Sequence, residues 1–180
     1  MPKYFAFLRA INVGGHIVKM DQLKSLFEEL GFTNVETFIA SGNVIFDAKV
    51  TNSKSLEHKI EKHLEKSLGY EVVTFQRSVD ELSAIAKHSA FPEKEINAEG
   101  HTLFVCFVND KPSGEGSKKL LAQASAIDGF HINEREVYWL YRRPSGESKF
   151  YGPSLEKSLG MKTTVRNVNT VHRLVKKYCK

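Results

Sequence analysis

The sequence of 180 residues has few cysteines and no long apolar run. Its two cysteines, Cys106 and Cys179, lie far apart and match neither a metal-binding nor a redox spacing. The longest apolar run, residues 4–8, is far shorter than the roughly 20 residues of a membrane-spanning helix. The first residues lack the basic and apolar regions of a signal peptide. We therefore predict a cytoplasmic protein with no membrane segment and no metal site.

Motifs that would identify a catalytic centre are also missing. There is no G-x-S-x-G or H-E-x-x-H motif, and the glycine-bearing loop at 9–15 lacks the lysine and spacing of a P-loop. His58 and His63 lie five residues apart on an expected helix, off a common face, and make a poor metal pair. His16 could act as an acid or base, but a lone loop histidine is more often incidental. No catalytic residue and no cofactor is predicted.

Apolar spacing predicts an alternation of strands and helices that runs through the chain twice. In the first half the expected strands are 3–9, 34–40, 43–48 and 71–76, and the expected helices are 20–30 and 56–68. A helix with a capping box at Ser78 and Glu81 follows. In the second half the expected strands are 102–108, 129–134, 136–142 and 163–165, and the expected helices are 117–126, 153–160 and 168–178.

This order is that of the ferredoxin-like split βαβ fold. We predict an α+β protein with two ferredoxin-like halves in tandem, built on antiparallel sheets, plus a C-terminal helix. The expected domains are residues 1–77 and 101–180, joined by a helix and a connector at 78–100.

Positive charge is concentrated in the second half. Residues 1–90 carry 11 basic and 11 acidic side chains, whereas residues 91–180 carry 15 and 10 and account for the whole net charge of +5. Residues 132–180 alone carry 11 basic and 4 acidic side chains. Such an asymmetry permits an anionic partner, although the basic residues of the final helix are more typical of a solvated face.

The predicted topology brings two polar loops to one end of the first sheet. The loop after the first strand (9–15) and the turn between the second and third strands (41–43) should meet, because the first and third strands are neighbours. We call these two segments the loop–hairpin rim. Its candidate ligand-binding residues are Arg9, Asn12, Gly14, Gly15, Ser41 and Asn43. Backbone amides, side-chain amides and an arginine suit an anion, but the same residues could serve only as a turn before the helix and a hairpin turn.

Aromatic side chains on the strands allow a second reading. The strand 136–142 carries aromatic residues on both faces. It ends in Arg142, which Arg143 follows, and this combination can stack bases and neutralise phosphates. Phe5, Phe7 and Phe46 would lie on two adjacent strands in the same way. Aromatic residues on strands are far more often part of a core, and we favour that interpretation.

Three segments together resemble a known family: FLRAINVGG at 7–15, TFIASGNVIF at 37–46 and TVRNVNTV at 164–171. The chain resembles the bacterial family of domain of unknown function 1697, whose members carry LLRGINVGG, YIQSGNVVF and TRNWNTV in that order. The resemblance spans nearly the whole chain, with Ala10 in place of the motif's glycine and Val168 in place of its tryptophan. It implies two ferredoxin-like halves and no established activity.

The resemblance draws attention to Arg166, Asn167 and Asn169. The asparagines can cap the final helix and leave Arg166 free at its positive end, or the three can form a polar site shared with the first two motifs.

Our best hypothesis is a binding protein for an anionic small molecule, such as a nucleotide, or a nucleic acid. The alternatives are an enzyme acting on a phosphorylated substrate, with Arg9, Asn12 and Ser41 as polarising groups, or a protein-interaction module.

Overall fold

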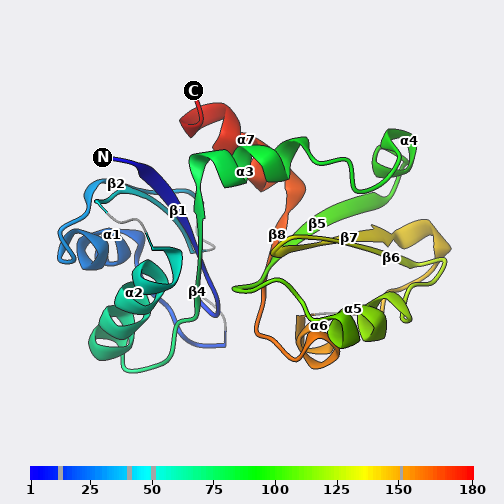
Figure 1. Ribbon diagram of the computed structural model, residues 1–180, viewed down its shortest axis with the longest axis horizontal. Helices are drawn as coiled ribbons and strands as arrows, with labels where there is room; N and C mark the ends of the chain where they lie inside the picture. Colours follow the sequence, from blue (N-terminus) through cyan, green and yellow to red (C-terminus); the bar gives the residue numbers. More distant parts are fainter. Residues whose placement is uncertain (12–13, 40–41, 50–51, 151) are drawn as a thin grey trace. The chain divides into compact units, whose positions relative to one another are not determined.

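Two four-stranded antiparallel sheets organise the protein (Figure 1). The computed structural model describes residues 1–11, 14–39, 42–49, 52–150 and 152–180. The chain divides into two units, the first made of Met1–Leu82 with Cys179 and the second of Ser83–Tyr178 with Lys180. The prediction of an α+β fold with two similar halves and a C-terminal helix is confirmed.

The first sheet has the strand order β2-β3-β1-β4, which is that of a ferredoxin-like fold. Its strands are β1 (Lys3–Leu8), β2 (Thr33–Thr37), β3 (Asn43–Asp47) and β4 (Thr74–Ser78). The helices α1 (Met20–Glu28) and α2 (Ser53–Leu68) cover one face (Figure 1). The core between these helices and the sheet is aromatic. The centroid of the Phe46 ring lies 4.5 Å from that of Phe32 and 5.4 Å from that of Phe27.

The second sheet repeats the order as β6-β7-β5-β8. Its strands are β5 (His101–Phe107), β6 (Asp128–Asn133), β7 (Glu136–Arg142) and β8 (Thr164–Asn167). The helices α5 (Gly114–Leu121) and α6 (Gly152–Leu159) pack together over one face (Figure 1). The short α4 (Glu93–Ile96) and the C-terminal α7 (Val168–Tyr178) contact β5. A 3-10 turn, η1 (Arg143–Ser145), follows β7.

Two details differ from the sequence prediction, and a third agrees with it. The fourth strand is Thr74–Ser78 instead of 71–76, because its pairing with β1 starts opposite Leu8, where β1 ends. The connector after α3 (Val79–Lys87) contains α4, a single turn too short to show helical periodicity. The predicted capping box at the start of α3 is confirmed, since the Ser78 amide donates to Glu81 Oε2 at 2.7 Å and the Glu81 amide to Ser78 Oγ at 3.2 Å.

The aromatic strand residues belong to the core, as we favoured. Phe5, Phe7 and Phe46 are at most 1% exposed. On β7, Tyr138 is buried and Trp139 packs against the core beneath α5 and α6, so successive side chains face opposite sides of the sheet. These rings are therefore unavailable as an open platform for stacking bases.

The described residues include no helix long and apolar enough to cross a bilayer. Within the same part of the chain there is no cluster of three or more histidine, cysteine, aspartate or glutamate side chains that could hold a metal ion.

Candidate functional site: the loop–hairpin rim

The loop after β1 and the turn before β3 meet, as the topology predicts. The Leu8 amide donates a hydrogen bond of 2.8 Å to the Gly42 carbonyl. A Cβ placed on Gly42 would lie 3.1 Å from Leu8 Cβ and 3.2 Å from Ile11 Cβ. A side chain at this position would crowd both residues, and Gly42 has a φ of 76°, which residues with a side chain rarely adopt. The close contact fixes the turn against the root of the loop.

Two non-glycine residues of this region adopt left-handed backbone conformations. Ala10 has a φ of 62° and Ile39 a φ of 49°. A positive φ is rare for a β-branched residue such as Ile39. Each such residue costs of order 1–3 kcal/mol and persists only where the surroundings enforce it. The strain therefore lies within the loop segment of the rim, at Ala10, and two residues before its turn segment, at Ile39.

The loop presents one cation and an exposed backbone. Arg9 is half-buried, and its amide donates to the Val73 carbonyl at 2.9 Å, which ties the start of the loop to the residues before β4. Gly14 and Gly15 are exposed, with φ values of 61° and 87°. A Cβ on either glycine would meet no atom within 4 Å, so the space above this stretch of backbone is open.

Asn43 has a structural role in the hairpin. It is 1% exposed, its side-chain amide donates to the Phe38 carbonyl at 2.9 Å, and its carbonyl accepts from the Phe38 amide at 3.0 Å. These bonds close the turn and favour the hairpin reading of this residue. The other two predicted rim residues, Asn12 and Ser41, lie outside the described residues.

Comparison with known proteins places this architecture in a family. The family model described as "Protein of unknown function (DUF1697)" matches residues 1–138. The chain belongs to this family. The first two motifs lie within the matched residues, whereas the third, at 164–171, lies beyond them.

A solved structure shows the same fold as this DUF1697 protein. It is described as a conserved bacterial protein, SP0830, from Streptococcus pneumoniae, and it is 19% identical with a TM-score of 0.72. The similarity covers 100% of this chain and 99% of the other. No curated protein matches the chain.

In this DUF1697 protein one residue of the third motif, Arg166, lies in a different place from the one expected. Arg166 is not free at the end of a helix: it lies in β8, 7% exposed, and its Nη1 donates to Thr164 Oγ1 at 2.7 Å and to the Val165 carbonyl at 3.0 Å. Burial lowers the pKa of its guanidinium to about 10. The expectation of a free Arg166 was wrong, because β8 extends further than predicted and includes this residue.

Asn167 caps the final helix, as expected. Its Oδ1 accepts a hydrogen bond of 2.9 Å from the Asn169 amide in the first turn of α7. The Asn169 side chain is exposed. The rim belongs to the first unit and this motif to the second, so a site shared by all three motifs stays a prediction.

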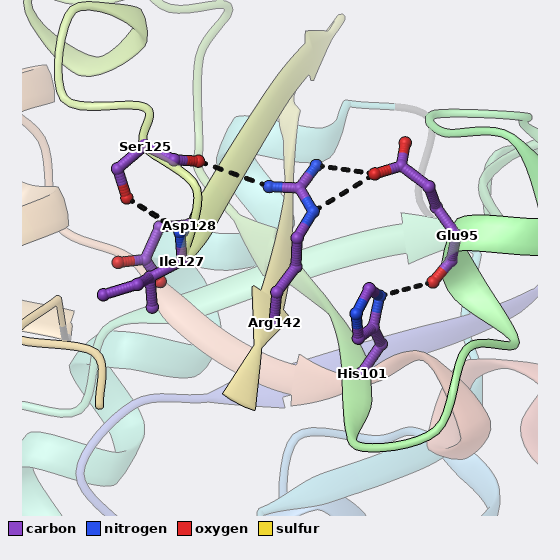
Figure 2. Close-up of polar contacts among 6 residues, drawn as sticks. All are labelled: Glu95, His101, Ser125, Ile127, Asp128 and Arg142. Carbon is purple, nitrogen blue, oxygen red and sulfur yellow. Dashed lines mark hydrogen bonds and ion pairs between the residues drawn. The ribbon is translucent and has the colours of Figure 1, made fainter. Parts of the chain in front are cut away.

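Sequence reasoning missed a polar cluster around Arg142 (Figure 2). Arg142 Nε and Nη2 both donate to Glu95 Oε1, at 3.1 and 3.0 Å, and Nη1 donates to the Ser125 carbonyl at 3.4 Å. His101 Nδ1 bonds to the Glu95 carbonyl at 2.6 Å. Arg142, which we considered as a phosphate-binding group, is therefore committed to holding α4 against the sheet. No local sequence pattern predicts an ion pair between Arg142 and Glu95, which are 47 positions apart.

Proposed function

We propose that the loop–hairpin rim binds a phosphate group of an anionic ligand. The observation that carries this proposal is a pair of left-handed residues: Ala10 lies in the loop 9–15, and Ile39 lies two residues before the turn 41–43, whose Gly42 contacts the start of that loop. Backbone strain of this kind gathers at ligand clamps and active sites, where the geometry it maintains is useful.

The chemistry of the rim supports a phosphate. Arg9 supplies a guanidinium, whose planar donors match phosphate oxygens. The exposed amides of Gly14 and Gly15 belong to a stretch of positive φ, and successive backbone N–H groups in such turns form concave anion sites. The absence of side chains on both glycines permits close approach of a ligand to the backbone.

The charges of the second unit favour a nucleotide over a nucleic-acid strand. Its excess of positive charge is the main sequence argument for a strand, yet Arg166 is buried and Arg142 is paired with Glu95. Fewer cations are thus available to neutralise successive phosphates. Neutralisation of phosphates by basic side chains dominates the affinity of a protein for a nucleic-acid strand.

Calorimetric titration with ATP and with short RNA and DNA strands at several salt concentrations tests the proposal. We expect ATP to bind the wild type and Arg9→Gln to weaken binding about tenfold or more, since a hydrogen bond to a charged group contributes roughly 1.5–3 kcal/mol. Lys49→Gln is the matched control, because Lys49 is exposed and lies beyond the opposite end of β3. Absence of ATP binding, or equal losses in the two variants, refutes the proposal. Strand binding that depends steeply on salt and on Arg9 would identify the ligand as a nucleic acid.

A further inference from the structure

The second unit contains a cavity of about 310 Å³, whose lining includes one residue of the third motif, Val168. Its apolar wall is formed by Ile85, Phe91, Ile96, Leu103 and Val168. Its polar lining includes the basic residues Lys87, His88 and His172, one acidic residue, Glu93, and Tyr138 and Ser89. A cavity of this size lined by both apolar and polar side chains can hold a small molecule.

A histidine pair lies at this cavity. His88 follows α3, and its Nε2 lies 2.9 Å from Nε2 of His131 on β6. The two ring planes are inclined by 29° with their centroids 5.0 Å apart, and the ring of Tyr138 lies 5.1 Å from that of His88. The 2.9 Å between the two ring nitrogens is a hydrogen-bond distance, so one imidazole donates to the other in an N–H···N bond.

The pairing determines what His88 offers to a ligand. Burial, and after it the neighbouring charge of His88, lower the pKa of His131, which favours the neutral form of His131. The remaining nitrogen of His88, Nδ1, has no bonding partner among the residues that the structure describes. Tyr138 is not available as a donor, because its hydroxyl donates to the Ile85 carbonyl at 3.2 Å.

The outer wall of the cavity is held in place by the cluster of Figure 2. Glu93 and Ile96 line the cavity from α4, and Glu95 between them is bound by Arg142 and, through its carbonyl, by His101. The ion pair between Arg142 and Glu95 therefore holds α4, which forms this wall of the cavity, in place.

We propose that this cavity binds a small organic acid, with its apolar part against the cavity wall and its carboxylate hydrogen-bonded to His88, whose orientation is maintained by His131. His88 donates from Nδ1 to the carboxylate, and Lys87 adds a positive charge to a lining that holds one acidic residue, Glu93. The site lies entirely within the second unit and is independent of the rim.

Titration with phenylacetate and with its neutral counterpart phenylacetamide tests this inference. In histidine-detected NMR at pH 6, phenylacetate should shift the ring signals of His88 and saturate, and phenylacetamide should bind at least tenfold more weakly. Equal binding of the two compounds, or no shift of His88 by either, overturns the proposal.

Variants separate binding from structural effects. His88→Gln should weaken phenylacetate binding about tenfold, whereas His58→Gln, a change of an exposed histidine on α2, should leave it unchanged. His131→Leu removes the hydrogen-bond partner of His88 and should weaken binding, and His131→Gln, which keeps a polar group that can bond to His88, should restore part of the affinity. Unchanged affinity in His131→Leu would contradict the positioning role of His131. If the variants do not fold, the acid–amide comparison on the wild type still decides the proposal.

Discussion

Replacing Ala10 by glycine should stabilise the protein. Ala10 has a φ of 62°, and a left-handed conformation costs an L-residue roughly 1–2 kcal/mol through the clash of its Cβ. Glycine removes that cost but adds about 0.4–1 kcal/mol of conformational freedom to the unfolded chain. The balance is an increase of about 0.5–1 kcal/mol in the free energy of unfolding.

Urea denaturation measures this change, and two probes locate it. Far-UV circular dichroism follows both units, whereas fluorescence of the single tryptophan, Trp139, follows the second. If the units unfold independently, only the dichroism transition of the first unit should move to higher urea. If they unfold together, both probes should shift equally.

Glu134→Gly is the matched control. Glu134 also has a positive φ, 52°, but it lies in the exposed turn between β6 and β7. Its replacement should stabilise the second unit by a similar amount through the same relief of strain. A gain for Glu134→Gly together with no gain, or a loss, for Ala10→Gly would refute the argument that the rim backbone is strained at Ala10.

Further changes give equally definite expectations. Gly42→Ala should lower the free energy of unfolding by about 2 kcal/mol in urea titrations, whereas Gly15→Ala, with open space around it, should cost about 1 kcal/mol. Glu95→Gln should cost about 0.5–1 kcal/mol, since the ion pair is partly exposed; a larger loss by thermal denaturation would contradict this estimate. Because the pKa of His131 is lowered in the folded state, stability should be full above about pH 6.5 and decline as the pH falls below it, and His131→Gln should flatten that decline in stability measured from pH 8 to 5. Burial raises the pKa of the Cys106 thiol, so a thiol reagent should modify it only in denaturant; rapid modification of both thiols in the native protein would exclude this.

The sequence was sufficient to predict the fold because the relevant signals are local. Apolar periodicity and one capping box place the strands and helices in the order that repeats, and the repeated order in turn implies the sheet. The meeting of the loop with the hairpin at Gly42 follows from that topology alone. Even the strain at Ala10 has a sequence signal, since the resemblance to the family shows a glycine at this position.

Long-range contacts and the burial of polar side chains could not be predicted from the sequence. Arg166 alternates with polar and apolar neighbours on a short strand, and nothing local distinguishes an inward-facing arginine from an outward-facing one. The hydrogen bond between His88 and His131 joins residues that are 43 positions apart in the sequence, one after the end of α3 and the other on β6. Their partners are determined by how β5, β6 and β7 assemble, which a pattern of residue types does not encode.

The hydrogen bond between Leu8 and Gly42 has a consequence for recognition. Because the turn and the root of the loop are attached to the same strand, these parts of the rim are already ordered before any ligand arrives. A ligand that contacts both segments would lose less conformational entropy than one that had to bring two independent loops together. Preorganisation of this kind lets a small contact surface discriminate between ligands, and it makes the turn glycine as important for affinity as the residues that touch the ligand.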